Sequence, residues 1–313
     1  MDPLRVLTAE CGFFTCREAK EAGYGDRDIA RMVRQRTWVR FRRGCYAFAD
    51  EWTNLDDVGR HRVRSSAVLR SHGDRVALSH VSGVIRHGID TWGVPLERVH
   101  VTRLDGGPGR IERDVIHHEG FAPQDDVRTV GGERVLTAAR CVVEAASRAR
   151  NEVALCLFDS GLRAEAFSVD DLHHSFQLME HWPFVQHLHV PIRMADGRSG
   201  SVGESRGRWW FRSVGMPAPQ LQFKVHDADG VLLGISDWWW ESQGVLGEFD
   251  GRIKYGRLLK PGQEPGDVVF EEKRREDRLR EQTGAKMLRL VWDDYQSPRE
   301  IRARFERLVG RVG

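Results

Sequence analysis

Hydrophobic positions in the first fifty residues recur in short groups separated by glycines and polar residues, a pattern that predicts three short helices. The first apolar group stops at Gly12. Thr15 is followed three residues later by Glu18, which is the spacing of a capping box, so a second helix is expected to begin there. Asp26 is expected to cap a third helix, whose apolar residues again recur at helical spacing.

Two strands are expected next, over residues 38–41 and 45–48, joined by a turn at Gly44. Three short helices followed by a hairpin is the element order of a winged helix-turn-helix. The sequence therefore predicts a winged helix-turn-helix domain over residues 1–50.

The pattern is less regular over residues 51–195, where we expect a mixed α/β connector. Strands are expected near 98–102 and 115–117, and helices near 135–148, 151–163 and 169–179. A connector, a dimerisation unit and a partner-binding domain all remain compatible with this segment. The polar, glycine-containing residues 195–200 are expected to form a linker.

After residue 200 the pattern changes quickly between helical and strand periods. The expected elements are a helix (201–215), three strands (220–226, 231–240, 245–250), a helix (268–283), a strand (287–292) and a helix (297–312). This αβββαβ order predicts a third domain over residues 196–313, and it makes the chain an α+β multidomain protein.

The hairpin between the second and third of these strands brings acids together. If it is symmetric about Ser242 and Gln243, Asp237 lies opposite Glu248, and Asp250 follows on the same face. Directly opposed carboxylates repel one another, and a divalent cation offsets that repulsion. The alternative is a pair of solvated strand-end acids, and a register slip of one residue would separate them.

Mg²⁺ prefers carboxylates, water and phosphate oxygens, so this arrangement suits phosphodiester hydrolysis assisted by Mg²⁺ or Mn²⁺. We expect Asp237, Glu248 and Asp250 to hold the metal. Lys254 would stabilise the charge that develops, and Glu204 lies in the first turn of a helix. Lys254 could equally form a salt bridge, and Glu204 could serve its own helix.

These acids carry a resemblance to the PD-(D/E)XK nuclease core, which is restriction-endonuclease-like, and to its very-short-patch-repair-like branch. The residues are Asp237-Trp238, then Glu248-Phe249-Asp250-Gly251, then Gly284 and Leu288-Arg289-Leu290-Val291-Trp292 after a charged stretch at 272–276. Lys254 stands where that branch usually has His. Glu204 resembles the helix glutamate of the same core, which implies that it assists as a further metal ligand or by orienting a water. The resemblance covers about residues 200–295, and it implies a metal-dependent DNA endonuclease acting in phage defence or repair.

A second resemblance covers roughly residues 5–160. Gly12-Phe13-Phe14-Thr15, Ala22-Gly23-Tyr24, the hairpin at 38–46 and Leu78-Ser79-His80-Val81-Ser82 are similar to the AbiEi-type antitoxin family. The resemblance implies a winged helix that represses its own operon and a nucleotidyltransferase toxin as partner. A repressor whose nuclease fold is catalytically inert is therefore the alternative to an enzyme.

Composition adds detail about partners. The chain has 313 residues and a net charge of only +2, yet between residues 29 and 49 there are six arginines and no acid. We expect this stretch to contact DNA through Arg31, Arg34, Arg40, Arg42 and Arg43. A solvated basic face is the alternative.

Neither a long apolar run nor the basic-then-apolar order of a signal peptide is present, which predicts a cytoplasmic protein without a membrane partner. A homodimer is compatible with the sequence, because nucleases of this kind often need two active sites. The histidines group at His117-His118, His173-His174, His187 and His189. They could form a metal site, although scattered surface and strand histidines are the simpler interpretation.

Overall fold

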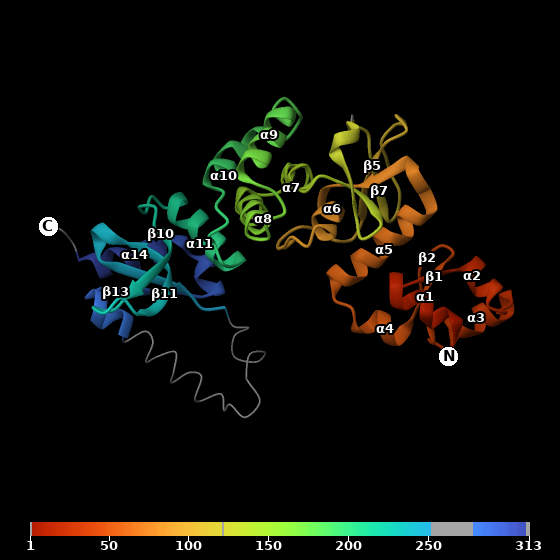
Figure 1. Ribbon diagram of the computed structural model, residues 1–313, viewed down its shortest axis with the longest axis horizontal. Coiled ribbons are helices and arrows are strands. Elements are labelled where there is room, and N and C mark those ends of the chain that lie inside the picture. The colour runs from red at the N-terminus through yellow and green to blue at the C-terminus, as the bar shows by residue number, and fades with distance from the viewer. Residues whose placement is uncertain (1, 121, 252–277, 311–313) are drawn as a thin grey trace. The chain divides into compact units, whose positions relative to one another are not determined.

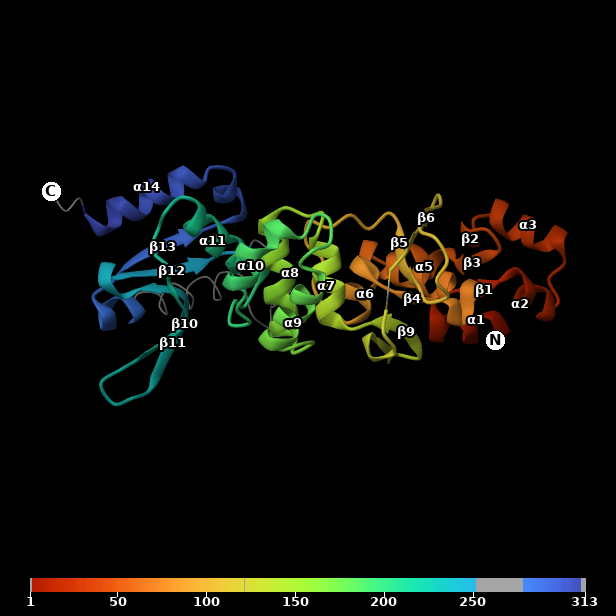
Figure 2. The ribbon, with the colours of Figure 1, turned by 90° about the horizontal axis from the view of Figure 1, so that it is seen from above.

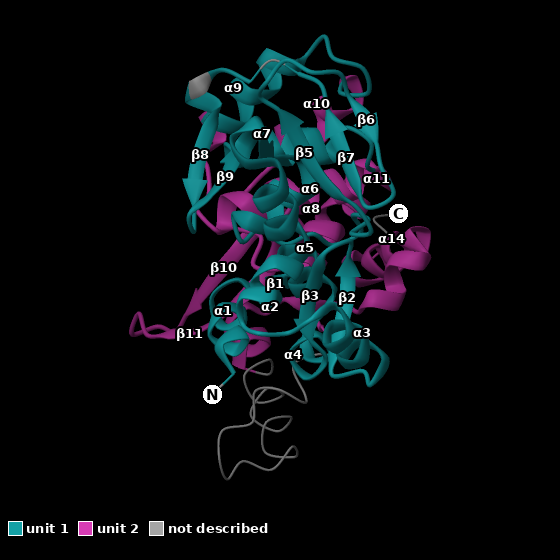
Figure 3. Cartoon of the chain, turned by 90° about the vertical axis from the view of Figure 1, so that its right-hand side faces the viewer, with its two compact units in different colours: residues 1–149, 171–185 teal, residues 150–170, 186–313 magenta. Residues whose placement is uncertain are grey.

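The computed structural model describes residues 2–120, 122–251 and 278–310. It divides the chain into two compact units (Figure 3). Unit 1 comprises residues 1–149 and 171–185, and unit 2 comprises residues 150–170 and 186–313. Both contain helices and sheets, and the sheets include parallel as well as antiparallel pairs, consistent with the expected α+β class.

Unit 1 begins with three helices and a small sheet (Figure 1). The elements are α1 (Pro3–Cys11), β1 (Phe14–Thr15), α2 (Cys16–Glu21), α3 (Asp26–Arg34), β2 (Trp38–Arg42) and β3 (Cys45–Phe48). The sheet has the order β1-β3-β2. Phe14 and Trp38 are almost fully buried, with ring centroids 4.7 Å apart, so the hairpin packs on the helices through aromatic side chains.

The expected capping box at Thr15 and Glu18 is confirmed, because each side chain bonds the backbone N–H of the other residue. The expectation that Asp26 caps α3 is wrong. Gly25 is the capping residue, and Asp28 accepts a hydrogen bond of 3.0 Å from its N–H. Glycine tolerates this position, and Asp28 satisfies an N–H that would otherwise lack a helical partner.

The rest of unit 1 is built on a six-stranded mixed sheet of order β6-β7-β5-β4-β9-β8. Its elements are α4 (Ala49–Asn54), α5 (Asp57–His72), β4 (Val76–Leu78), α6 (His80–Arg86), β5 (Val99–Arg103), β6 (Arg110–Ile111), β7 (Val115–His118), β8 (Val127–Val130), β9 (Glu133–Leu136) and α7 (Ala138–Ala146). Strands β5 and β7 run parallel, and Val101 pairs with His117. Successive residues of a strand face opposite sides, so His117 and His118 point to different faces of the sheet.

Unit 2 contains a four-stranded sheet of order β10-β11-β12-β13. Its elements are α8 (Asn151–Arg163), α10 (His189–Met194), α11 (Val202–Ser213), β10 (Gln220–His226), β11 (Leu232–Trp240), β12 (Val245–Phe249), β13 (Lys286–Leu290) and α14 (Pro298–Val309), while α9 (Val169–Met179) spans the division between the units. Figure 2 shows β10 and β11 as a long hairpin extending from the sheet. Trp238 and Trp240 are buried in a core formed with Phe211 of α11 and Phe305 of α14.

Residues 195–200 do not behave as the expected linker. The Asp196 N–H donates to the buried carboxylate of Asp159 at 2.8 Å, and Ser199 is only 1% exposed. Residues 195–200 are therefore tied to α8 by a hydrogen bond within unit 2, although Arg198 and Gly200 are exposed. The expected helix over residues 268–283 lies mostly outside the described residues, and its described end, 278–283, is helical.

No helix among the described residues is both long enough and apolar enough to cross a membrane.

Candidate functional site

The register of the β11–β12 hairpin brings two of the predicted acids together. Trp238 pairs with Gly247 and Trp240 pairs with Val245, as the predicted symmetry requires. Continuing this register by one residue places Asp237 opposite Glu248. A slip of one residue would move Trp238 and Trp240 out of the core, so the burial of the tryptophans fixes the position of the acids.

The acids are held by specific partners. Asp237 accepts a hydrogen bond of 2.8 Å from the N–H of Phe249, which ties the end of β12 to β11. Glu248 is 4% exposed and faces Arg289, with 3.5 Å between Oε2 and Nη2. The other terminal nitrogen of Arg289 lies 3.5 Å from Oδ2 of Asp250. One guanidinium therefore bridges Glu248 and Asp250.

Arg289 is the residue of this group that sequence reasoning had not assigned to the site. It stands on β13, which pairs in parallel with β12 so that Glu248 and Arg289 are register partners. Asp237, Glu248 and Arg289 therefore form a row across three neighbouring strands. We call these three residues, together with Asp250, the acidic row. The sequence does show an Arg among the apolar residues of β13. It does not show that β13 pairs with β12, because a long segment separates the two strands.

Glu204 lies at the start of α11, and its carboxylate mainly accepts hydrogen bonds from residues at the N-terminus of that helix. Ser201 Oγ donates to its Oε1 at 2.9 Å, and the Gly200 N–H donates to Oε2 at 2.7 Å. The side-chain amide of Gln222 donates to the same Oε2 at 2.8 Å. Both carboxylate oxygens are therefore engaged, and Glu204 anchors α11 to β10.

Gln222 connects Glu204 to the acidic row. Its neighbours Leu221 and Phe223 pair with Trp238 and Ser236, so Gln222 lies beside Asp237. Its φ of +50° is in the left-handed region, which is uncommon for residues other than glycine. Strained backbone of this kind often accompanies functional sites. Glu204 thus reaches the acidic row through an amide rather than directly.

The donor atoms of the acidic row suit Mg²⁺ or Mn²⁺, because such ions take one or two carboxylates and complete their shell with water and phosphate oxygen. Asp237 and Glu248 would supply the carboxylates. Within the described part of the chain, no three of the acids bring their oxygens within 4.8 Å of one another. Lys254, the expected cation, lies outside the described residues.

The predicted DNA-binding arginines differ in exposure. Arg31, Arg34, Arg40 and Arg43 are exposed on α3, β2 and the turn that follows it. The side chain of Arg42 is 15% exposed and forms an ion pair of 2.5 Å with Asp114. Four of the five therefore face solvent, whereas Arg42 joins the hairpin to the six-stranded sheet of the same unit.

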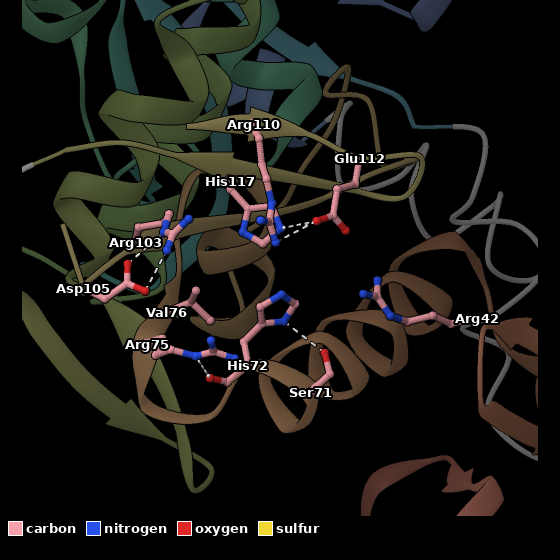
Figure 4. A pocket seen from close by; sticks show the side chains of 10 residues that line it. All are labelled: Arg42, Ser71, His72, Arg75, Val76, Arg103, Asp105, Arg110, Glu112 and His117. Atoms are coloured by element: carbon pink, nitrogen blue, oxygen red, sulfur yellow. Dashed lines mark hydrogen bonds and ion pairs between the residues drawn. The ribbon is translucent and has the colours of Figure 1, made fainter. Parts of the chain in front are cut away.

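Arg42 also lines a polar pocket of about 320 Å³ in unit 1 (Figure 4). His72 and His117 face one another there, with ring centroids 5.0 Å apart. The cations of this pocket are compensated internally, as Arg103 binds Asp105 through two bonds of 2.7 Å and Arg110 lies 2.9 Å from Glu112. The pocket is accordingly less cationic than its four arginines suggest.

The structure gathers histidines that the sequence had not brought together. His80, His100 and His118 each place a ring nitrogen within 4.8 Å of the others, and no other set of three metal-ligand side chains does so among the described residues. Of the histidines grouped in the sequence, only His118 belongs to this set. We call these three residues the histidine triad.

No protein-family model matches the chain, and no curated protein matches it.

Proposed function

We propose that the chain is a DNA-binding protein whose unit 2 hydrolyses DNA phosphodiester bonds with Mg²⁺ or Mn²⁺. The observation that supports this most strongly is the pairing of Asp237 with Glu248 at one end of a buried hairpin, next to Asp250 and Arg289. Glu248 is buried and Asp237 is partly buried, and adjacent carboxylates in such a place are costly because their charges repel.

In this proposal Asp237 and Glu248 would hold the metal, whose chemistry at the site would be to provide an activated water as nucleophile. Asp250 orients the site, and Arg289 stabilises charge on the phosphate as the bond breaks. Lys254, which lies outside the described residues, would share that role. Glu204 would act as a positioning residue through Gln222.

Residues 1–50 would deliver the enzyme to DNA as a winged helix-turn-helix. Arg31 and Arg34 on α3 would approach the major groove, and Arg40 and Arg43 would contact phosphates from the hairpin. Arg42 would hold the hairpin in place through Asp114. A DNA target of this kind places the protein in the cytoplasm, and phage defence or DNA repair are the settings that we propose.

A second function is favoured by one feature. Arg289 already compensates Glu248 and Asp250 without a metal, which suits an antitoxin-like repressor whose nuclease fold is inert. Such a protein would bind DNA through residues 1–50, take a nucleotidyltransferase toxin as its partner, and need no catalytic ion.

Cleavage of supercoiled plasmid with Mg²⁺ or Mn²⁺ separates the two functions. The Asp237→Asn and Glu248→Gln variants should lose at least about a hundredfold in rate, the scale of losing a major electrostatic contribution. Asp229→Asn, in the exposed turn between β10 and β11, is the matched control and should cleave normally. Chelation with EDTA should abolish the activity.

Two results would reject the enzyme. One is a folded protein that binds DNA but cleaves neither double-stranded, single-stranded nor mismatched DNA. The other is cleavage that survives in both Asp237→Asn and Glu248→Gln. DNA binding is tested separately with the double variant Arg40→Ala/Arg43→Ala. Because it should lose about two phosphate contacts, its DNA-binding constant should depend less steeply on salt, with a slope of log K against log salt that is smaller by about two.

A further inference from the structure

The histidine triad is assembled from three separate elements of unit 1. His80 begins α6, His100 stands on β5, and His118 ends β7. Because β5 and β7 are parallel and Thr102 pairs with His118, His100 and His118 lie on the same face of the sheet, one step apart. The rings of His80 and His118 stack with centroids 3.6 Å apart.

Two ring nitrogens of the triad point directly at each other. Nδ1 of His100 and Nε2 of His118 are 3.0 Å apart, so one shared proton lies between two imidazole lone pairs. A metal ion can bind both nitrogens once that proton has moved to the other nitrogen of its ring. Tetrahedral Zn²⁺ with bonds of about 2.0–2.1 Å separates its ligand nitrogens by roughly 3.4 Å, close to the spacing in this pair.

The third histidine is oriented by a carboxylate. Nδ1 of His80 lies 3.2 Å from Oε2 of Glu144, a buried residue of α7. Glu144 is itself fixed by Arg140, whose Nε donates to Oε1 at 2.8 Å. A histidine that donates one nitrogen to a carboxylate and offers the other to a metal is the usual arrangement in metal sites.

Burial also lowers the pKa of two of these imidazoles. Burial, together with the neighbouring imidazoles His80 and His118, lowers the pKa of His100 to about 2. Burial and His80 lower the pKa of His118 to about 3. His80 also adopts a φ of +48°, so the chain holds its ring beside the other two in an unfavourable backbone conformation.

We propose that His80, His100 and His118 form a binding site for a divalent transition-metal ion of the Zn²⁺ type, with Glu144 orienting His80. Nitrogen ligands distinguish it from the acidic row, whose oxygen ligands suit Mg²⁺. The ion would bind Nδ1 of His100 and Nε2 of His118, and the proton now held between these atoms would pass to the outer nitrogen of its own ring, so that both imidazoles keep one N–H. The ring of His80 would turn out of its stack on His118 to present its Nε2 as the third ligand.

Spectroscopic titration of the full-length protein with Co²⁺ tests the site. After removal of metals with a chelator, we expect one equivalent of Co²⁺ to give the intense visible bands of a tetrahedral nitrogen site, and Zn²⁺ to displace it. His100→Asn and His118→Asn should each weaken binding by more than about 100-fold. Glu144→Gln should weaken it by about 10–100-fold, the usual cost of losing an orienting carboxylate.

His174→Asn is the matched control, because His174 is exposed on α9, away from the triad in the chain. It should bind Co²⁺ like the unchanged protein. The circular dichroism of each variant is measured alongside, so that a variant that fails to fold is discarded. The spectrum of the unchanged protein then decides alone.

Three outcomes would overturn the site. The first is no stoichiometric binding of Co²⁺ or Zn²⁺ by the unchanged protein. The second is a weak octahedral spectrum or sulfur charge-transfer bands, which would place the ion on carboxylates or cysteines. The third is unchanged affinity in folded His100→Asn and His118→Asn.

Discussion

Arg289 contacts two acids at once, and this decides how the acidic row responds to its surroundings. Its guanidinium stands 3.5 Å from both Glu248 and Asp250, at distances too long for strong hydrogen bonds but suited to ion pairs. The guanidinium and a divalent ion therefore compete to neutralise the same carboxylates. Such competition can be measured without any assay of activity.

Replacing Arg289 by Met should make folding depend on the metal. Glu248 is buried and would lose its cation, so we expect a loss of about 1–3 kcal/mol in the free energy of unfolding without metal. Millimolar Mg²⁺ or Mn²⁺ should restore a larger part of the melting temperature in Arg289→Met than in the unchanged protein. Differential scanning fluorimetry with and without metal measures both.

Arg302→Met is the control for this change, because Arg302 also pairs with a carboxylate, Glu306, but on the exposed face of α14. It should alter stability by less than about 1 kcal/mol, with no response to metal. An equal response of both variants to Mg²⁺ would mean that the acidic row does not bind the ion.

At the scale of elements, the close approach of α11 to β12 depends on Gly203. A Cβ added there would lie 2.0 Å from the ring of Phe249. That ring stacks on Tyr295, whose hydroxyl donates to the Gly203 carbonyl at 2.6 Å. The end of β12, and with it Glu248, is therefore positioned by a helix that comes unusually near.

Gly203→Ala should destabilise unit 2 by about 1–3 kcal/mol. The free-energy cost of displacing the Phe249 ring should exceed the roughly 1 kcal/mol by which Ala stabilises a helix relative to Gly. Gly120→Ala, where the nearest atoms are 3.9 Å away, should stay within about 0.5 kcal/mol. Urea unfolding followed by circular dichroism measures the difference. A Gly203→Ala protein as stable as the unchanged one would mean that α11 can move away from the sheet.

The capping box of α2 makes a prediction about pH. Burial raises the pKa of Glu18, but the N–H and hydroxyl of Thr15 and the charge of Arg70 outweigh this and hold the pKa below its usual value of 4.5. A carboxylate with a lowered pKa contributes stability that is complete above the unfolded pKa and is lost as the pH falls through the folded one.

Glu18→Gln should therefore cost about 0.5–1 kcal/mol near neutral pH, and the difference from the unchanged protein should shrink as the pH falls below about 4. Melting temperatures across this pH range measure it. Glu21→Gln, on the exposed side of α2, should give a small difference that hardly varies with pH. A difference for Glu18→Gln that grows in acid would contradict the assignment.

The sequence predicts elements well where hydrophobic period and turn residues agree. Strand β10 and helices α8 and α9 have the expected bounds, and the β11–β12 register is the one expected of a hairpin symmetric about Ser242 and Gln243. Contacts between segments that are distant in the chain cannot be predicted in this way. The pairing of Arg289 with Glu248 depends on a parallel strand that a long connection separates from β12. The histidine triad takes one residue from each of three elements. Spacing within a local stretch of sequence therefore predicts neither contact.

At the scale of the whole molecule, the grouping of elements departs from their order in the chain. Unit 2 includes α8, because Arg206 of α11 donates to Glu152 at 2.6 Å and Arg208 donates to Asp159 at 2.7 Å. Both acids are buried. Charged pairs of this kind are costly to break from one side, so α8 and α11 stabilise each other.

A fragment of residues 196–313 should therefore be much less stable than a fragment of residues 150–313. The shorter one leaves Arg206 and Arg208 without their acids and exposes the side of α11 that packs on α8. We expect a lower melting temperature and self-association on size-exclusion chromatography for 196–313 alone. Equal stability of the two fragments would show that α8 is dispensable, in keeping with the predicted boundary at residue 196.

The interleaving of the two units also sets an order of events on the ribosome. Unit 1 needs residues 171–185, so it cannot be completed until all of α8 has already been synthesised. Helix α8 must then wait for α11, residues 202–213, before its buried acids find their arginines. At about 5–20 residues per second this delay lasts roughly seconds, during which Glu152 and Asp159 stay without these arginines.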